Sequence, residues 1–242
     1  MIGSSSGRKS DPLLPWPHSS FLGSLTSGER DALLALGVER KYPPGKIILR
    51  QGEAGEFVVL IVRGIAKVGI VADTGKEMLV GIRGAGELIG EMAALSGEPR
   101  FASVAAATEV HGKVIKAGPF IGHLARSPGV GSRLAQMVAD RLRAANRLRL
   151  EFHSYPVEGR IARVLGEVAL AHGHLEGTAW RIGPEITQAD IASLSSVSVR
   201  TVEKVLRTFE QEGLVIRKRR DLVVIDTAAL DARAEHFPII PS

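Results

Sequence analysis

The sequence contains no cysteine, which excludes a disulfide framework, a Cys-ligated zinc site, an iron–sulfur cluster and a thiol redox sensor. Long hydrophobic runs are also missing. The longest, Phe57 to Val62, has the length of a strand and falls far short of the roughly 18 residues of a membrane span. The first residues are rich in Ser, Gly and Pro, so we expect no secretory signal. These absences predict a cytoplasmic protein with no membrane partner.

The composition is otherwise that of a folded protein, with 45% hydrophobic and 24% charged residues in a chain of 242. This length predicts one large or two modest domains, because a domain usually takes roughly 100–200 residues. The net charge of +5 favours a polyanionic partner without identifying one, since many soluble proteins are mildly basic.

The first half of the chain has the pattern of a β domain. We expect flexible tails at residues 1–20 and 228–242, and a domain over 21–128 that begins with a helical segment capped by Thr26 or Ser27. Short apolar runs separated by glycine-bearing turns then predict an all-β sandwich or barrel. The runs are 47–49, 57–62, 66–71, 78–82, 102–107 and 110–115.

A long helix is predicted over residues 129–153. Its apolar residues form one stripe that needs a partner, and a second copy of the chain is the simplest one. The predicted dimer interface consists of Leu134, Val138, Leu142, Ala145, Leu148 and Phe152. Arginines occupy the opposite face, namely Arg133, Arg141, Arg143, Arg147 and Arg149. The alternative is that the stripe packs only on the β domain of its own chain.

Residues 154–227 predict a separate DNA-binding domain. A helix over 158–172 and a strand over 179–182 precede two closely spaced helices, the first capped by Thr187 and the second by Ser198. Two short strands with a basic tip follow. This is the layout of a winged helix-turn-helix, whose second helix enters the major groove of DNA.

The charges of this domain are segregated rather than in excess. Between residues 155 and 227, ten basic residues balance ten acidic ones, so bulk charge does not indicate DNA. Seven of the basic residues, however, lie on the outer face of the second helix and on the wing: Arg200, Lys204, Arg207, Arg217, Lys218, Arg219 and Arg220. The alternative is a solvated helix followed by a basic turn.

Residues 86–104 hold a second group of candidate functional residues. Gly90, Glu91 and Met92 open a short helix whose N–H groups suit an anion, and Arg100 adds a charge-assisted bond to the same phosphate. Glu91 is able to accept a hydrogen bond from a sugar hydroxyl. A phosphate beside a sugar indicates a nucleotide. The alternative is a structural Glu91–Arg100 ion pair inside a jelly roll.

This segment resembles the phosphate-binding cassette of cyclic-nucleotide-binding domains, F/I-G-E-L/M-A followed by P-R-A/T/S-A. The matching residues are Ile89-Gly90-Glu91-Met92-Ala93 and Pro99-Arg100-Phe101-Ala102. Segments along the rest of the chain resemble landmarks of the cyclic AMP receptor protein (CRP/FNR) family, colinearly from 21 to 226. They are Tyr42-Pro43, Arg50-Gln51-Gly52-Glu53, Gly75-Lys76-Glu77-Met78, Gly159-Arg160-Ile161-Ala162 and Ile186-Thr187-Gln188-Ala189-Asp190-Ile191-Ala192.

The resemblance implies an α+β fold with an N-terminal cyclic-nucleotide-binding β-roll (a jelly roll), a long dimerisation helix and a C-terminal winged helix-turn-helix. It implies a homodimeric transcription regulator whose effector is a cyclic nucleotide, with cAMP the first candidate. Its partners would be a palindromic double-stranded operator and RNA polymerase. The nucleotide-binding residues would be Gly90, Glu91, Met92, Arg100, Phe101 and Asn146. The DNA-binding residues would be Thr187, Gln188, Ser198, Val199, Arg200, Thr201, Lys204, Lys218, Arg219 and Arg220.

The chain departs from the family pattern at three positions, and the first two leave the effector open. Phe101 replaces a small hydroxyl residue, and Ala145 replaces one of two polar residues that contact adenine, although Asn146 remains. The effector is therefore cAMP, another nucleotide, or none. In the recognition helix, the acidic residue that reads cytosine is also missing, so the family's usual operator is not assumed.

Catalysis, metal binding and haem binding are not expected. The sequence shows no nucleophile–base set, metal-ligand cluster or P-loop. A haem would depend on His111 or His123, and a lone histidine is more often a surface or core residue. The alternatives to an effector-controlled regulator are a regulator that needs no effector, or a nucleotide-sensing subunit that acts on a partner protein.

Overall fold

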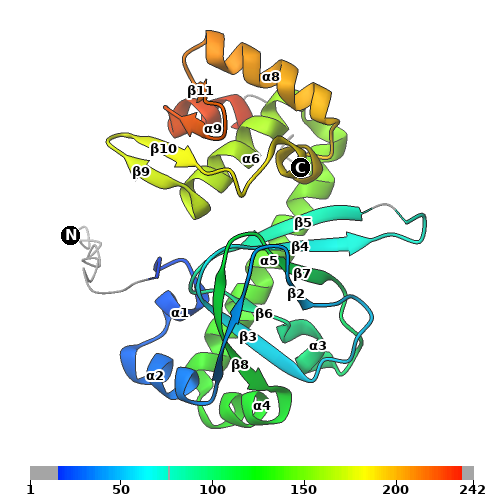
Figure 1. Ribbon diagram of the computed structural model, residues 1–242, viewed down its shortest axis with the longest axis vertical. Helices are drawn as coiled ribbons and strands as arrows, with labels where there is room; N and C mark the ends of the chain where they lie inside the picture. Colours follow the sequence, from blue (N-terminus) through cyan, green and yellow to red (C-terminus); the bar gives the residue numbers. More distant parts are fainter. Residues whose placement is uncertain (1–15, 76, 236–242) are drawn as a thin grey trace, which may run out of the picture.

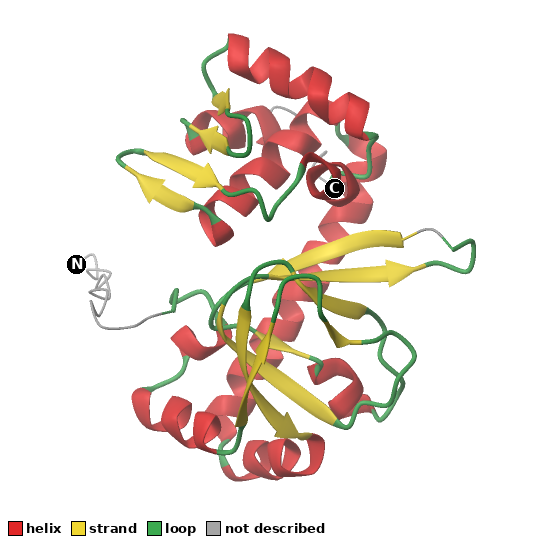
Figure 2. Cartoon of the chain, in the orientation of Figure 1, coloured by secondary structure: helices red, strands yellow, loops and turns green. Residues whose placement is uncertain are grey.

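The computed structural model describes residues 16–75 and 77–235, which form two lobes connected by one long helix (Figure 1). The fold is α+β. The N-terminal lobe is a β-roll, and the C-terminal lobe is a helical domain with a small sheet (Figure 2). Within the described residues, no helix is both long and apolar enough to cross a membrane.

Two four-stranded antiparallel sheets form the β-roll. One has the order β1-β8-β3-β6 and the other β2-β7-β4-β5. The strands are β1 (Val38–Tyr42), β2 (Ile47–Leu49), β3 (Phe57–Arg63), β4 (Ala66–Val71), β5 (Glu77–Arg83), β6 (Leu88–Ile89), β7 (Ser103–Ala106) and β8 (Val110–Lys116). Buried apolar residues from both sheets, such as Leu49, Val59 and Val104, fill the space between them.

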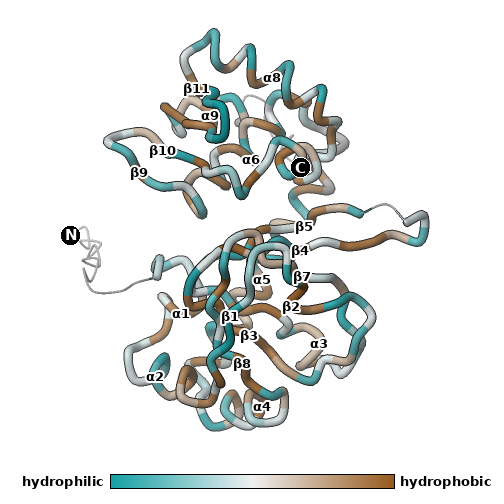
Figure 3. The backbone as a smooth tube through the Cα atoms, viewed as in Figure 1, coloured by the Kyte–Doolittle hydropathy of each residue, from teal (hydrophilic) through white to brown (hydrophobic). Residues whose placement is uncertain are grey.

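Helices cover the outer face of the first sheet. They are α1 (Phe21–Ser24), α2 (Ser27–Ala35), α4 (Ala117–Arg126) and the start of α5 (Pro128–Ser154), while α3 (Glu91–Ser96) follows β6. Strand β3 is hydrophobic along most of its length (Figure 3), because it is buried on both faces. Its Val58 and Leu60 pack against the helices, whereas Val59 and Ile61 face the inner core.

We predicted one helical segment at the start of the β domain. The structure has two helices there, α1 and α2, with a break between them. Thr26 caps α2 through a capping box with Glu29. Residues 16–20, which we expected to belong to a flexible tail, are instead packed: the Trp16 Nε1 donates to the Val62 carbonyl at 2.9 Å, and Ser20 caps α1. Residues 1–15 lie outside the described part of the chain.

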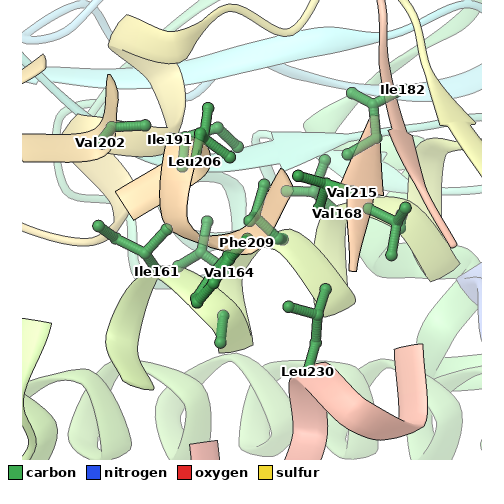
Figure 4. Packing of buried hydrophobic residues seen from close by; sticks show 14 of the residues in the cluster. Ile161, Val164, Val168, Ile182, Ile191, Val202, Leu206, Phe209, Val215 and Leu230 are labelled. Atoms are coloured by element: carbon green, nitrogen blue, oxygen red, sulfur yellow. The ribbon is translucent and has the colours of Figure 1, made fainter. Parts of the chain in front are cut away.

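The C-terminal lobe consists of helices α6 to α9 and a four-stranded sheet of order β11-β12-β10-β9. Its elements are α6 (Val157–His172), β9 (His174–Glu176), β10 (Ala179–Ile182), α7 (Gln188–Leu194), α8 (Val199–Gln211), β11 (Val215–Arg217), β12 (Leu222–Val224) and α9 (Thr227–Glu235). Figure 4 shows Phe209 and Leu206 of α8 against Ile161 and Val164 of α6. This packing fixes α8 on the body of the lobe.

Helix α9 corrects the expectation of a C-terminal tail from residue 228. Leu230 and Ala234 are one helical turn apart and fully buried, and α9 packs along α6. The apolar side chains at this spacing stabilise a helix that the sequence alone did not distinguish from a tail. Residues 236–242 of the expected tail lie outside the described part.

The two lobes contact each other through the β4–β5 hairpin and α7. The Lys67 Nζ lies 2.7 Å from the Asp190 Oδ2, and the Leu79 amide donates to the Ser193 Oγ at 2.8 Å. Ile82 of β5 is buried within the core of the C-terminal lobe. The orientation of the C-terminal lobe is therefore supported by specific polar and apolar contacts.

Candidate nucleotide and DNA sites

The cassette begins with a sharp change of direction between β6 and α3. Gly90 is the N-cap of α3 and has a φ of +84°, a conformation that residues with a Cβ rarely adopt. A Cβ at this position would lie 2.5 Å from the Arg100 Nη1. Glycine is thus required both by the backbone and by the closeness of the arginine.

Glu91 is the first residue of α3 and is only 3% exposed. One of its carboxylate oxygens lies 2.6 Å from the Arg141 Nη1, and the Arg141 Nη2 donates to the Leu88 carbonyl at 2.8 Å. We expected Arg141 on the face of α5 opposite the apolar stripe, and this was wrong. Arg141 instead points into the cassette, because a buried carboxylate needs a charged partner.

Arg100 is 4% exposed and forms no ion pair with Glu91, so the structural pair considered above is not formed. Its Nη1 donates to the Gly90 carbonyl at 2.7 Å and its Nη2 donates to the Phe57 carbonyl. The guanidinium also lies over the Phe57 ring, 5.1 Å from the centroid. Burial lowers the pKa of Arg100, while the nearby Glu91 carboxylate opposes this shift. Arg100 is therefore held in one orientation beside Gly90 and Glu91.

The side chains of the other predicted nucleotide-binding residues are exposed. Met92 is 55% exposed and Phe101 is 65% exposed. Asn146 is exposed on α5, farther along the helix than Arg141. The structure thus brings Gly90, Glu91 and Arg100 together. It leaves the side chains of Met92, Phe101 and Asn146 exposed.

The helix-turn-helix is formed as the sequence predicts. Thr187 caps α7 through a capping box with Asp190, and Ser198 caps α8 by accepting from the Thr201 amide at 3.1 Å. The turn between the helices includes Ser196 at a φ of +54°. Helix α8 lies at the outer edge of its lobe, away from the β-roll (Figure 1).

The face of α8 opposite the core is exposed over its first turns. Ser198, Val199, Arg200 and Lys204 are exposed there, and Thr201 is partly exposed. The buried face carries Val202, Val205, Leu206 and Phe209. The predicted base-reading residues are therefore on the surface that DNA would approach.

Some basic residues of the wing are exposed, and one is held in an ion pair. Lys218, Arg219 and Arg220 are exposed at the tip between β11 and β12. Arg217, in contrast, pairs with Glu210 of α8 at 2.7 Å. The basic surface is thus smaller than the seven residues counted from the sequence, and on α8 Arg207 is likewise paired, with Glu203.

Thr187 and Gln188 are exposed at the start of α7. Asp190, one turn later, accepts from both Thr187 and Lys67 of the β-roll. These two predicted DNA contacts consequently lie beside the contact between the lobes.

The predicted dimer stripe of α5 is divided between two environments. Leu134 is buried in the core of its own β-roll, and Val138 packs against the same core. Leu134 and Val138 are therefore not available for the predicted dimer interface, because the start of α5 covers the sheet of its own chain. Leu142 is 61% exposed, Ala145 is exposed and Leu148 is partly exposed. The Phe152 side chain lies outside the described part of the structure.

Comparison with known proteins identifies the two domains that carry these candidate sites. The family model of the cyclic nucleotide-binding domain matches residues 39–127, and that of the Crp-like helix-turn-helix domain matches residues 159–233. The "CRP-like cAMP-activated global transcriptional regulator" of Mycobacterium tuberculosis is 30% identical over 193 residues, which cover 80% of this chain and 86% of the relative. The chain belongs to the CRP/FNR family.

A second relative and two solved structures extend the comparison. The "Cyclic AMP receptor protein" of Thermus thermophilus is 31% identical over 215 residues, covering 88% of this chain and 94% of the relative. The Thermus thermophilus catabolite activator protein structure matches with a TM-score of 0.51 at 27% identity, over 88% of this chain and 97% of that one. FixK2 from Bradyrhizobium japonicum matches with a TM-score of 0.71 over 81% and 96%, and its 18% identity supports the fold alone.

Membership of this family defines the class of function. The protein is a DNA-binding transcription regulator with a cyclic-nucleotide-binding domain, and it is not an enzyme. Arg141 is the residue that sequence reasoning assigned to the wrong face. Its place on the face of α5 that also carries Leu134 and Val138, which pack on the β-roll, was the available signal.

Proposed function

We propose that the protein is a homodimeric cytoplasmic regulator whose binding to a palindromic operator is controlled by a cyclic nucleotide in the β-roll, with cAMP the first candidate. The observation that carries this proposal is the buried arrangement of Gly90, Glu91 and Arg100 in a chain that also presents α8. Arg100 is buried, and no carboxylate of the described residues lies within ion-pair distance of it; a buried cation without a counter-charge is costly unless a ligand supplies one.

The residues present fit a cyclic nucleotide. An arginine has five N–H donors; two of those on Arg100 bond to carbonyls, which leaves three for a phosphate. The N-terminus of α3 has no side-chain cap, and Gly90 lets a phosphate approach the backbone. Glu91 would accept from the ribose hydroxyl, while Met92, Phe101 and Asn146 would contact the nucleotide at its edge.

The Glu91–Arg141 pair links this site to α5. Because Arg141 is on α5 and Glu91 is in the cassette, a ribose hydroxyl that bonds to Glu91 competes with Arg141 for the same carboxylate. Binding would thereby change the position of α5 relative to the β-roll. In a dimer joined along α5 by Leu142, Ala145 and Leu148, this change would reposition the two copies of α8.

On DNA, the proposed contacts divide into two kinds. Arg200 and Lys204 would read base edges in the major groove, with Val199 against a thymine methyl. Thr187, Gln188, Ser198, Thr201, Lys218, Arg219 and Arg220 would bind the sugar–phosphate backbone. RNA polymerase would be the further partner of the bound dimer.

A second candidate function is regulation without an effector. It is favoured by the fact that Glu91 and Arg100 already have partners within the chain, namely Arg141 and two backbone carbonyls. Phe101 also supplies no hydroxyl to a phosphate. In this case the cassette only stabilises the β-roll.

Calorimetric titration with cAMP and with cGMP separates these functions. We expect saturable binding of one nucleotide and a tighter complex with DNA in its presence. Arg100→Gln is expected to abolish both effects while binding to arbitrary DNA persists. Absence of heat from both nucleotides, together with unchanged DNA affinity, would favour the effector-independent regulator.

A regulatory subunit that acts on a partner protein is tested separately. Chromatin immunoprecipitation is expected to enrich discrete genomic sites. A stable protein partner recovered without any such enrichment would contradict the proposed role on DNA.

A further inference from the structure

A pocket of about 460 Å³ opens on the β-roll at a place that neither proposed site uses. It is lined by Arg40, Tyr42, Glu56, Phe57, Val114 and Lys116. These residues come from β1, from β8 and from the start of β3, which are adjacent strands of one sheet. Phe57 and Lys116 are direct partners in the sheet register. The volume is in the range of small-molecule sites, about 300–1,000 Å³.

The wall of this pocket is apolar and partly aromatic. Tyr42, Phe57 and Val114 are half-buried and pack against the inner core of the β-roll. Flat rings at such a wall favour an aromatic ligand, because offset stacking adds to the burial of apolar area. Burial also raises the pKa of the Tyr42 hydroxyl, which therefore stays neutral at physiological pH.

The rim of the pocket carries two cations and one acid. Arg40 and Lys116 are exposed, and neither forms an ion pair with another residue in the described part of the chain. Glu56 supplies the opposite charge. An excess of positive charge above an apolar wall selects a small anion with an apolar body.

Phe57 connects the pocket to the cassette. Its carbonyl accepts from the Arg100 Nη2, and its ring lies under the same guanidinium. Since one residue forms a wall of the pocket and holds Arg100, a ligand that moves Phe57 also moves Arg100.

We propose that this pocket binds a small aromatic carboxylate. The carboxylate pairs with Arg40 and Lys116, and the ring lies against Tyr42 and Phe57. A compact inorganic anion would leave the apolar wall unused. The site is separate from the cassette, so the proposal does not depend on a cyclic nucleotide.

The test is calorimetric titration of the full-length protein with 2-naphthoate, with 2-naphthamide as the neutral ligand and inorganic phosphate as the compact anion. We expect saturable binding of naphthoate only. The double variant Arg40→Gln/Lys116→Gln is expected to weaken it at least about tenfold, since both charge-assisted bonds to the carboxylate are lost. Glu56→Gln is expected to tighten it.

The matched control is Lys41→Gln/Lys113→Gln. It removes the same charge from the same two strands at residues that do not line the pocket, and we expect unchanged naphthoate affinity. Equal weakening in both double variants, equal binding of phosphate, or no saturable binding would overturn the proposal.

Glu91→Gln distinguishes this site from the cassette, since Glu91, unlike Arg100, makes no hydrogen bond to Phe57. The variant is expected to keep naphthoate binding even though nucleotide binding is lost. Loss of naphthoate binding in this variant, or complete displacement of naphthoate by cAMP, would place the ligand in the cassette and contradict the proposal.

Discussion

At the scale of single residues, the pair formed by Glu91 and Arg141 determines how the cassette contacts the long helix. Glu91 is almost fully buried, and the Arg141 side chain is 21% exposed. Removing one partner of a buried pair leaves an uncompensated charge, which costs far more than losing a surface pair. Arg141 also donates to the Leu88 carbonyl, so its loss leaves a second group without its partner.

Arg141→Met is expected to lower the free energy of unfolding by about 1–3 kcal/mol. The measurement is urea unfolding, and a double-mutant cycle with Glu91→Gln should show coupling of about 0.5–3 kcal/mol. Arg143→Met is the matched control, because Arg143 pairs with the exposed Asp140 on the same helix and should cost nothing measurable. Equal costs for the two arginines would mean that the Glu91 contact contributes little.

At the scale of elements, the wing and α8 form one unit because Arg217 is tied to Glu210. Both the backbone amide and the guanidinium of Arg217 donate to this carboxylate, and these bonds lower the pKa of Glu210. The tip beyond it presents Lys218, Arg219 and Arg220 to solvent. Arg217 thus holds the wing against α8, whereas Arg219 is exposed to solvent at the tip.

Arg219→Ala is expected to reduce the slope of log K against log[salt] for DNA binding by about 1, since one phosphate contact is lost. The loss should be similar for specific and arbitrary DNA. Arg217→Ala is the matched variant and should leave the salt slope unchanged while lowering stability. Fluorescence anisotropy over a salt series measures the slope for both variants. A change of slope in Arg217→Ala but not in Arg219→Ala would show that Arg217, and not Arg219, contacts the phosphate.

The exposed part of α5 provides a second prediction at this scale. Leu142→Glu is expected to shift the protein from dimer to monomer at micromolar concentration, because a buried leucine contributes about 1.5–3 kcal/mol. Arg143→Glu is the control, since residue 143 is exposed on the side of the helix opposite Ala145 and Leu148. Analytical ultracentrifugation measures both, and a dimer that survives Leu142→Glu would contradict an interface along this stripe.

Sequence patterns predicted elements well where one physical cause dominates. Strands β2 and β4 occupy the residues expected from apolar runs between glycine turns, and the caps of α2, α7 and α8 follow from their side chains. Strand β1 was missed because its residues, VERKY, are exposed at the edge of a sheet. Helix α4 was not predicted because Gly118 and Pro119 disfavour a helix, whereas proline is tolerated in the first turn of a helix.

The sequence predicted the candidate sites only in part. Motif spacing located Gly90, Glu91 and Arg100, but it did not show which partners they have. Helical periodicity identified the α5 stripe, and tertiary packing then divided it, with Leu134 inside its own β-roll and Leu142 exposed. Arg141 could not be assigned from periodicity, which gives the angle between side chains and not what covers each face.

At the scale of the whole molecule, His172 lies where α6 meets the β-roll. Its Nδ1 is buried with no hydrogen-bond partner among the described residues, and Gly84 of the β-roll lies close by. Burial lowers the pKa of His172, Arg83 lowers it further, and Glu87 opposes both. The neutral imidazole is thus the form that the contact between the lobes accommodates.

This shift predicts a loss of stability in mild acid. Because the folded-state pKa is lowered, the unfolded chain binds more protons at and below about pH 6.5, and stability falls as the pH decreases through that value. Urea unfolding between about pH 7.5 and 5.5 measures the effect. His172→Gln is expected to flatten this part of the profile, and an unchanged slope would show that His172 does not contribute.

The central claim is that occupation of the cassette changes the affinity of α8 for DNA. The most direct measurement is the Kd of the cyclic nucleotide, determined with and without a DNA fragment selected from a random library. Linkage requires that the nucleotide and the DNA change each other's affinity by the same factor. We predict a factor of about 5–150, corresponding to a coupling of about 1–3 kcal/mol, and its loss in Arg100→Gln. Equal nucleotide affinity with and without DNA would contradict the account.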